Sequence, residues 1–255
     1  MGRLEGKIVV AVGAATGIGE ATVRKMISEG AKVFLGDINM TAANSLAMSL
    51  RSDGGVIEVH FADQREDNSI KEFIHAAKAH FGRLDCLFLN GADTRPKTGA
   101  ADTDVVEIDI GLWDEIMEVN LRGYMLGLRY AVPLMLETGG GSIVLTGSEL
   151  GFKSDGPMLA YGVSKAGVHQ LSRHIASRFG KQGVRCNVVA PGVIVTEVAK
   201  AYLTAEIEKV LMSRICGTRM GVPEDVAPTV VHLLSDESAY INGQAISING
   251  GSLFR

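Results

Sequence analysis

Short apolar runs alternate with segments of helical spacing along nearly the whole chain. Each run is almost continuously apolar and rich in β-branched residues, as in residues 7–12, whereas a half-exposed strand would alternate apolar and polar positions. Seven such runs predict strands, at residues 7–12, 31–36, 56–62, 84–89, 142–146, 184–190 and 245–248. The sequence therefore predicts a doubly wound (Rossmann) α/β fold, in which helices cover both faces of a seven-stranded parallel sheet.

Six helices are expected between these strands, including a long one over residues 116–136 and one near residues 223–234. In these segments apolar residues recur three and four positions apart and share one helix face. Examples are Ile70, Phe73, Ile74 and Ala77 in one helix, and Val168, Leu171 and Ile175 in another.

Two stretches do not fit this alternation. Residues 93–112 are rich in Asp and Glu, and residues 196–221 mix apolar residues with Glu and Lys. Both follow strands, so both are expected at the carboxyl edge of the sheet, where doubly wound folds bind their ligands. We expect residues 196–221 to form a substrate loop or lid. The acidic residues of 93–112 either form a solvated loop or touch substrate or a partner subunit.

The composition fits one domain spanning residues 1–255. The chain is 46% hydrophobic and has no internal repeat or Pro/Gly linker that would mark a second domain. Its net charge of −4 leaves no basic stripe for nucleic acid. No apolar run approaches the ~18 residues of a membrane-spanning helix, and the N-terminus lacks the apolar region of a signal peptide. We therefore expect a cytoplasmic protein that binds neither nucleic acid nor membrane.

Cysteines and histidines give no sign of a disulfide or a metal site. The three cysteines form no Cys-x-x-Cys pair, and the six histidines show no metal-ligand spacing, so no metal is predicted. Cys86 and Cys186 fall in predicted strands, so we expect them to be reduced and to fill the core. Cys216 lies in a polar stretch, where it is either a reactive thiol or a packing residue.

A glycine-rich turn connects the first predicted strand to the first helix. Glycines there permit a tight turn and let the helix N-terminus approach a pyrophosphate closely. An ordinary glycine-rich turn is the alternative, but the strand-turn-helix context favours a phosphate-binding loop. The candidate cofactor contacts in this loop are Gly13, Thr16, Gly17, Ile18 and Gly19.

Asp37 ends the second predicted strand, about 20 residues after the glycines. A carboxylate at this place accepts hydrogen bonds from the adenosine ribose hydroxyls and repels a ribose phosphate. Neither Ala15 nor Ile38 is a basic residue that would bind that phosphate, so the pattern favours NAD over NADP. The alternative is that Asp37 is a turn residue before the next helix, although Asn39 is available to cap that helix.

Tyr161 and Lys165 lie four residues apart in a predicted helix, so their side chains share one face. Ser148 follows a predicted strand and would bring a hydroxyl to the same place. An opposite charge within roughly 4–6 Å lowers a pKa by about 1–3 units, so Lys165 is expected to lower the pKa of Tyr161. The three residues outline a proton-transfer site.

These motifs together resemble the short-chain dehydrogenase/reductase family, in order and spacing, over nearly the whole chain. In chain order they are Gly13-x-x-x-Gly17-x-Gly19, Asp37, Asp63, Asn120, Ser148, Tyr161-x-x-x-Lys165, Pro191-Gly192 with Thr196, and Asn249-Gly250-Gly251. By this resemblance Tyr161 would be the general acid/base, and Ser148 would hydrogen-bond the substrate oxygen. Lys165 would bind the nicotinamide ribose, and Asn120 would hold a water that relays protons from Lys165 to solvent.

The resemblance also implies further cofactor contacts. They would be Asp63 at the adenine, Asn90 after the fourth strand, and Pro191, Gly192, Val193 and Thr196 at the nicotinamide end. Three of the matching residues have structural alternatives: Asn120 as a helix residue bonded to backbone, Asp63 as a turn residue and Thr196 as a helix cap.

The chain departs from the family pattern at several positions. Val12 stands where Thr is usual, Leu89-Asn90-Gly91-Ala92 replaces Asn-Asn-Ala-Gly, and Asn249 stands where Asp is usual. The stretch 93–112 is also a few residues longer than the common form. These differences leave the catalytic residues intact.

The sequence thus predicts an NAD-dependent oxidoreductase that interconverts a secondary alcohol and its ketone. Glu149 faces either the pocket, where it would recognise a polar substrate group, or solvent. Apolar residues of the expected lid would favour an apolar or cyclic, hydroxysteroid-like substrate, but they would equally pack on the core. They are Val195, Val198, Tyr202, Leu203, Ile207, Val210, Leu211 and Ile215.

A 3-oxoacyl or other carbonyl reductase on the same fold is the alternative function. A noncatalytic NAD-binding regulator is a third one, which the intact catalytic set opposes. The expected partner is a small-molecule alcohol or ketone. By the resemblance the chain would form a homotetramer through the helices around Asn120 and Tyr161 and through its C-terminal segment.

Overall fold

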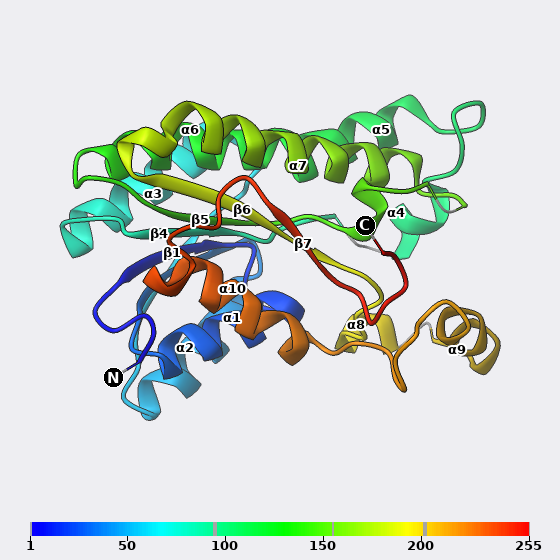
Figure 1. The fold of residues 1–255 in the computed structure, drawn as a ribbon, viewed down its shortest axis with the longest axis horizontal. Helices are drawn as coiled ribbons and strands as arrows, with labels where there is room; N and C mark the ends of the chain where they lie inside the picture. Colours follow the sequence, from blue (N-terminus) through cyan, green and yellow to red (C-terminus); the bar gives the residue numbers. More distant parts are fainter. Residues whose placement is uncertain (1, 94–95, 155, 201–202, 255) are drawn as a thin grey trace.

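Residues 2–93, 96–154, 156–200 and 203–254 are described in the computed structural model. They form one domain built on a parallel sheet of seven strands in the order β3-β2-β1-β4-β5-β6-β7 (Figure 1). The strands are β1 (Ile8–Val12), β2 (Lys32–Asp37), β3 (Val56–Phe61), β4 (Cys86–Leu89), β5 (Gly141–Thr146), β6 (Val184–Pro191) and β7 (Ala245–Ile248). The predicted fold class and all seven predicted strands are confirmed, with ends that differ by at most two residues.

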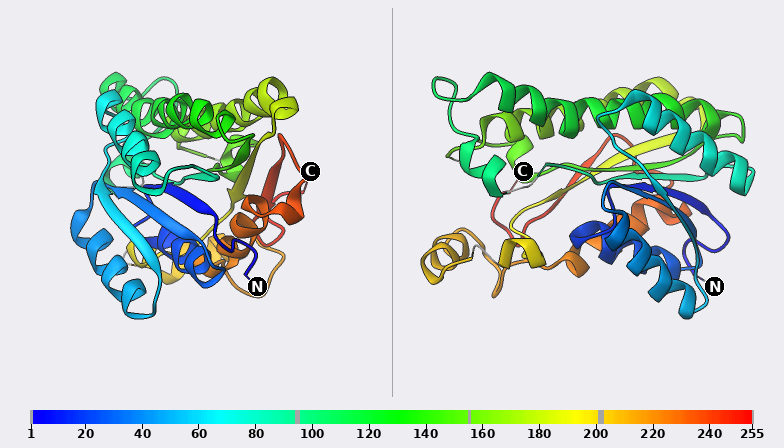
Figure 2. Two further views of the ribbon diagram at one scale, coloured as in Figure 1. Left: turned by 90° about the vertical axis from the view of Figure 1, so that its left-hand side faces the viewer. Right: turned by 180° about the vertical axis from the view of Figure 1, so that it is seen from behind.

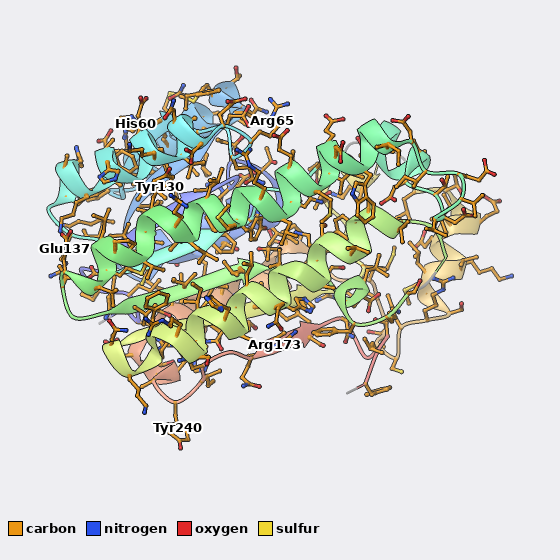
Figure 3. The ribbon with its side chains drawn as sticks, turned by 90° about the horizontal axis from the view of Figure 1, so that it is seen from above. His60, Arg65, Tyr130, Glu137, Arg173 and Tyr240 are labelled. Atoms are coloured by element: carbon orange, nitrogen blue, oxygen red, sulfur yellow. The ribbon has the colours of Figure 1, made fainter. Side chains whose placement is uncertain are left out.

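Helices cover both faces of this sheet. One face carries α1 (Gly17–Ser28), α2 (Met40–Ser52) and α10 (Pro223–Leu234), and the other carries α3 (Asp67–Phe81), α6 (Gly123–Leu136) and α7 (Leu159–Phe179) (Figures 1 and 2). Viewed from above, α6 and α7 run side by side, with Tyr130 on α6 and Arg173 on α7 (Figure 3). Tyr130 joins α6 to α3, because its hydroxyl donates to Asp67 Oδ1 at 2.6 Å.

The two faces of the sheet have separate apolar cores. Successive residues of a strand point to opposite faces, so Val10 packs beneath α3, α6 and α7 while Val9 packs beneath α1, α2 and α10. Cys86 and Cys186 are 1% and 0% exposed, which confirms that they fill the core. Burial raises the pKa of both thiols to about 12.

The helix predicted over residues 116–136 is interrupted. It consists of α5 (Ile110–Met117), a π-helical turn η1 (Glu118–Arg122) and α6. A π turn shifts the hydrogen-bond ladder and releases a backbone carbonyl. Gln64, which follows β3, hydrogen-bonds a carbonyl of this turn, since its Nε2 donates to Val119 O at 2.7 Å and also to Gly91 O at 2.9 Å. The interruption places Asn120 inside the π turn.

The strand order reverses between β1 and β4, and the loops that follow β4, β5 and β6 gather at the carboxyl edge beside this point (right-hand side of Figure 1). They contain α4 (Pro96–Ala101), the 3₁₀ turn η2 (Glu149–Gly151), α8 (Glu197–Lys200) and α9 (Ala205–Met212). Two further 3₁₀ turns, η3 (Gly180–Gln182) and η4 (Asp236–Ser238), lie elsewhere. A crevice at such a reversal is where doubly wound sheets bind ligands.

The apolar residues of α9 do not pack on the core. This helix has no buried residue, and Ile207 and Val210 are 45% and 51% exposed. The alternative that these positions pack on the core is therefore wrong for α9. Val198 and Tyr202 lie outside the described side chains. Among the described helices, none is long and apolar enough to cross a membrane.

Candidate active site

Ser148, Tyr161 and Lys165 meet at the carboxyl edge of β5. Tyr161 is the third residue of α7, and Ser148, two residues past the end of β5, lies near enough to its phenol to lower the pKa of that group. Lys165 lies one helical turn further, 1% exposed, and its Nζ donates to Thr146 O at 2.8 Å. Strand β5 therefore supplies the carbonyl that fixes the lysine, and the turn directly after it supplies the serine.

Burial shifts the pKa values of Tyr161 and Lys165. Burial raises the pKa of Tyr161 above its usual value of 10, and the Ser148 hydrogen bond opposes that rise. Burial lowers the pKa of Lys165 from 10.5 to about 7. The expectation that Lys165 lowers the pKa of Tyr161 is thus wrong for the chain alone. Its Nζ lies 5.6 Å from the centre of the Tyr161 ring, and its own charge is disfavoured there.

Tyr124 belongs to the same cluster but was missed in the sequence. It is fully buried, its hydroxyl donates to Thr146 O at 3.2 Å, and its ring centre lies 5.1 Å from Lys165 Nζ. The signal that could have revealed it is its position four residues after Asn120 in the long predicted helix, which would put both side chains on one face.

Asn120 lies beside the trio on η1, which packs against α7. Its Oδ1 accepts a hydrogen bond from Asp93 N at 2.8 Å, so the amide is held by the loop after β4 and not by Lys165. Its Nδ2 is buried and makes no hydrogen bond within the described part of the chain. Because a buried donor without a partner is costly, this nitrogen is a suitable contact for a bound water.

The glycines of the turn after β1 are required for two different reasons. A Cβ on Gly13 would lie 2.2 Å from Gly91 Cα, and one on Gly19 would lie 2.4 Å from Ala14 Cα, so the turn itself needs both. Gly17 has φ +57°, and a Cβ there would meet only Thr196 Cγ2, at 3.1 Å. Thr16, the N-cap residue of α1, makes no side-chain cap hydrogen bond. The amide groups of this helix end are thus suited to a pyrophosphate.

Two carboxylates follow the neighbouring strands β2 and β3. Asp37 accepts hydrogen bonds from Ala15 N at 3.0 Å and from Asn39 N at 2.8 Å, while Asn39 caps α2 through Ala42 N. Asp63 is 8% exposed and pairs with the guanidinium of Arg65, which lowers the pKa of the carboxyl. Asp63 also accepts from Arg65 N at 3.0 Å, as a turn residue does. Both carboxylates lie at or just after the carboxyl ends of their strands.

Asn90 and the residues after β6 connect neighbouring segments at the carboxyl edge of the sheet by hydrogen bonds. Asn90 Nδ2 donates to Gly13 O at 2.7 Å, and its Oδ1 accepts from Thr146 Oγ1 at 3.0 Å. Pro191 is the last residue of β6, and the loop after it holds Gly192, Val193 and Thr196. Gly192 N donates to Ile248 O at 3.0 Å, and Thr196 Oγ1 accepts from Ala199 N at 3.2 Å, as a helix cap does. Thr196 also lies near the glycine turn, since a Cβ on Gly17 would be 3.1 Å from its Cγ2.

Two departures from the family pattern have a structural cause. Gly91 stands where Ala is usual, and a Cβ on it would lie 2.3 Å from Gln64 Oε1. Asn249 stands where Asp is usual, and its Nδ2 donates to Leu253 O at 3.0 Å while its Oδ1 accepts from Gly251 N. An aspartate could accept but not donate here. Nothing in the structure explains Val12.

Glu149 is buried, at 8% exposed, so the alternative that it faces solvent is wrong. Its Oε2 accepts a hydrogen bond from Ser252 Oγ in the C-terminal segment, and its Oε1 pairs with Lys153 Nζ at 3.4 Å. A Cβ on Gly192 would lie 3.2 Å from the same Oε2. The carboxylate thus lies close to both the C-terminal segment and the loop after β6.

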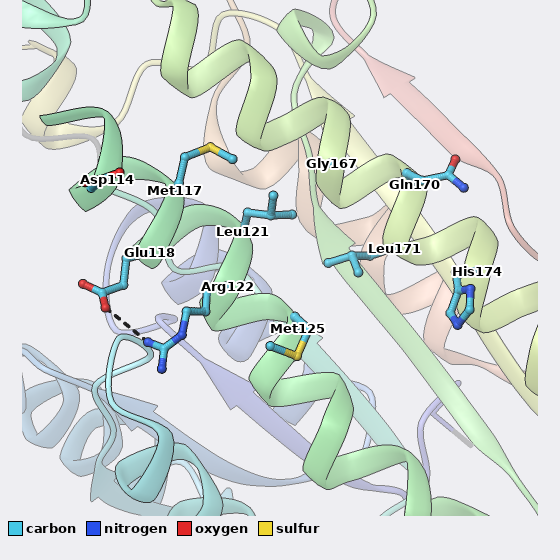
Figure 4. Close-up of a pocket in the computed structure, with 10 residues that line it drawn as sticks. All are labelled: Asp114, Met117, Glu118, Leu121, Arg122, Met125, Gly167, Gln170, Leu171 and His174. Carbon is cyan, nitrogen blue, oxygen red and sulfur yellow. Dashed lines mark hydrogen bonds and ion pairs between the residues drawn. The ribbon is translucent and has the colours of Figure 1, made fainter. Parts of the chain in front are cut away.

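A large cavity lies away from these residues. It has a volume of about 720 Å³ and forms a groove between α7 and the helical run α5, η1 and α6 (Figure 4). It is lined by Asp114, Met117, Glu118, Leu121, Arg122, Met125, Gly167, Gln170, Leu171 and His174. None of these is a predicted catalytic or cofactor-binding residue.

The fold and the comparison with known proteins define a class of protein: an oxidoreductase with a Rossmann-like fold. A family model described as enoyl-(acyl carrier protein) reductase matches residues 13–252. The chain belongs to the short-chain dehydrogenase/reductase family, whose members use a nicotinamide cofactor.

Similar proteins cover the chain almost completely. A 7α-hydroxysteroid dehydrogenase of Bacteroides fragilis is 37% identical over 251 residues, which is 98% of this chain and 96% of that protein. A 3-oxoacyl-(acyl-carrier-protein) reductase of Thermotoga maritima is 35% identical over 98% of both chains. A solved 7α-hydroxysteroid dehydrogenase complexed with NADH and 7-oxo glycochenodeoxycholic acid superposes with a TM-score of 0.90, at 28% identity over 98% of this chain and 95% of that one.

Proposed function

We propose that the protein is an NAD-dependent dehydrogenase that interconverts a secondary alcohol, apolar or cyclic and of hydroxysteroid type, and its ketone. The observation that carries this proposal is the placement of Ser148 and Tyr161 beside the buried Lys165, at the edge where the glycine turn and Asp37 offer a nucleotide site. A bound nicotinamide would accept or supply the hydride at the carbinol carbon.

The residues of the chain would handle the proton and the oxygen. Ser148 would donate a hydrogen bond to the substrate oxygen, and Tyr161 would take the hydroxyl proton during oxidation or return it during reduction. Because burial raises the pKa of Tyr161, the phenol is held as an acid at neutral pH, which suits ketone reduction. Oxidation needs the deprotonated phenol and would gain from higher pH. Lys165 and a water on Asn120 Nδ2 would pass the proton on to solvent.

The cofactor preference for NAD rests on charge. The Asp37 carboxylate would bind ribose hydroxyls and repel a ribose phosphate. Ala15 and Ile38 are not basic, so neither would bind such a phosphate. The remaining contacts would come from Gly13, Thr16, Gly17, Ile18 and Gly19 at the pyrophosphate, Asp63 at the adenine, Asn90 in the crevice and Pro191, Gly192, Val193 and Thr196 near the nicotinamide. The similar structure that contains NADH supports this assignment.

The substrate class rests on the expected lid and on the relatives. Residues 196–221 would cover the substrate, with exposed apolar positions such as Ile207 and Val210 available to a steroid or cyclic alcohol. A relative 37% identical is a 7α-hydroxysteroid dehydrogenase, which supports this class. The relative that reduces 3-oxoacyl-(acyl-carrier-protein) makes a carbonyl reductase the second candidate.

The proposal is tested by following the absorbance of reduced cofactor over secondary alcohols, steroids, sugars and diols, and over 3-oxoacyl thioesters, with NAD and NADP in parallel. Positioned acid/base groups contribute about 10²–10⁴ in rate, so Tyr161→Phe should lose at least about 100-fold in kcat and still bind NADH. Tyr240→Phe is the matched control, because Tyr240 is fully exposed. Retention of most activity by Tyr161→Phe would refute the mechanism.

We also propose that the chain assembles as a homotetramer, using the groove of Figure 4 as one interface. The groove is mainly apolar, with Met117, Leu121, Met125 and Leu171 among its lining residues, and it runs along the helices that carry Asn120 and Tyr161. A second copy of the same helices offers a surface of matching length and chemistry.

A further inference from the structure

The first turn of α7 is held by a part of the chain far from it in sequence. Met158 occupies the N-cap position with φ +85°, and its side chain makes no cap hydrogen bond. The carboxylate of Asp102 takes that place. Its Oδ1 accepts from Ala160 N and its Oδ2 from Tyr161 N, both at 2.9 Å. These contacts join residues 58 and 59 positions apart.

The backbone beside this carboxylate completes the cap. Asp102 O accepts from Met158 N at 2.7 Å, and Thr103 O accepts from Leu159 N at 3.3 Å. Asp102 is 1% exposed, so the acidic stretch 93–112 is not simply a solvated loop. The first N–H groups of a helix lack hydrogen-bond acceptors within the helix and carry partial positive charge. A buried carboxylate supplies the acceptors and balances that charge. One of the two amide groups held in this way belongs to Tyr161 itself.

The same stretch also reaches Asn120. Asp93 N donates to Asn120 Oδ1 at 2.8 Å, Thr98 Oγ1 donates to Asp93 Oδ2 at 3.2 Å, and Asp102 N donates to Thr98 O at 3.0 Å. A chain of hydrogen bonds therefore runs from Asn120 through α4 to the backbone of Tyr161. It connects the two helical elements that carry the proposed proton path.

We propose that Asp102 is a positioning residue for Tyr161. The inference rests on the proposed function of Tyr161 as acid/base. By fixing the amide of Tyr161, the carboxylate sets where the phenol stands relative to Ser148 and substrate. A misplacement of about 1 Å at a reacting group costs up to about 100-fold in rate, so a cap this close to Tyr161 controls turnover as well as helix stability.

The test compares Asp102→Asn and Asp102→Leu with Asp109→Asn. Asparagine keeps one acceptor and leucine keeps none, whereas Asp109 caps α5 in the same manner through Leu112 N and touches no proposed catalytic residue. Two quantities are measured: deuterium exchange in the peptide spanning residues 158–165, and kcat per NADH-binding site together with KM and the dissociation constant of NADH.

Asp102→Asn should speed exchange in this peptide and lower kcat by about tenfold, and Asp102→Leu should approach 100-fold, with NADH binding within about threefold of the wild type. Asp109→Asn should change neither quantity more than about twofold. Unchanged exchange in Asp102→Asn would refute the cap whether or not the wild type turns over an alcohol. Faster exchange with unchanged kcat per site would make Asp102 a structural cap only, and would overturn the proposal. A wild type without turnover would refute the proposed function instead.

Discussion

Lys165 is a fully buried lysine whose amine has one hydrogen-bond acceptor, Thr146 O, and two aromatic rings around it. Its pKa in the fold is about 7, against 10.5 ordinarily. Between these values the unfolded chain binds a proton that the folded protein has released, so the free energy of unfolding rises with pH from about pH 7 to about pH 10.

Lys165→Met removes this dependence. We expect the stability of the wild type relative to Lys165→Met to increase as pH rises through that window, measured by urea denaturation at pH 7, 8, 9 and 10. Lys71→Met, at an exposed position of α3, serves as the control and should run parallel to the wild type. A difference between wild type and Lys165→Met that stays constant with pH would contradict the lowered pKa.

Gly13 is required by a close backbone approach as well as by its conformation. Gly13→Ala would place a Cβ 2.2 Å from Gly91 Cα at φ +66°. We expect a loss of about 2–5 kcal/mol, from strain in the left-handed region and from the overlap, together with weaker NADH binding. Gly54→Ala, at φ +85° with nothing within 4 Å of the new Cβ, should cost only about 1–2 kcal/mol. Equal losses in urea denaturation would refute the role of the contact.

At the level of single residues, the sequence predicted where side chains lie better than how deeply they are buried. The spacing of Tyr161 and Lys165 correctly placed both side chains on one helix face beside Ser148. It could not predict that burial raises the pKa of Tyr161, because burial depends on the packing of other elements around it. Glu149 was ambiguous for the same reason, since its partner Ser252 is distant in sequence.

Gln64 is the main external support of the π turn η1. It is buried between Gly91 and Gly123, and its two hydrogen bonds satisfy carbonyls of two different segments. Gln64→Leu leaves both carbonyls without this donor, so we expect a loss of about 2–4 kcal/mol in urea denaturation. Gln244→Leu removes an exposed hydrogen bond to Asn242 O and should stay within about 0.5 kcal/mol of the wild type. Similar values for the two variants would contradict this role.

Element boundaries were predictable where they depend on local pattern and were missed where they depend on distant residues. Continuous apolar runs located every strand, and the cap of α2 by Asn39 was correctly read from the adjacent sequence. The break in the predicted helix 116–136 was missed, because it depends on Gln64. The start of α7 likewise depends on Asp102, which no local pattern connects to it.

The proposal that the groove of Figure 4 is an interface between subunits can be tested by sedimentation. Met125 lines it and is 38% exposed, so Met125→Glu would put a charge on the proposed interface without disturbing the core. We expect this variant to sediment as a smaller species than the wild type. Met48→Glu, at a 71% exposed position of α2 on the opposite face, should sediment like the wild type. If Met125→Glu kept the mass of the wild type, the groove would not be an interface.

The architecture as a whole followed from the sequence because alternation of strands and helices permits few arrangements. The predicted parallel sheet and single domain are confirmed, and the reversal of strand order at β1 and β4 lies beside the predicted glycine turn. The groove was not predicted, since it arises from the packing of α7 against α5, η1 and α6, which no local pattern shows.

The pairing of α1 with α10 has a consequence for synthesis on the ribosome. These helices lie side by side on one face of the sheet, yet α1 ends at Ser28 and α10 begins at Pro223 (Figure 1). Translation proceeds at about 5–20 residues per second, so roughly 200 intervening residues take roughly 10–40 s. Throughout that time the apolar side of α1, with Val23 and Met26, is not yet covered by α10. A nascent chain of this protein therefore exposes an apolar surface to which chaperones can bind, until α10 has been synthesised.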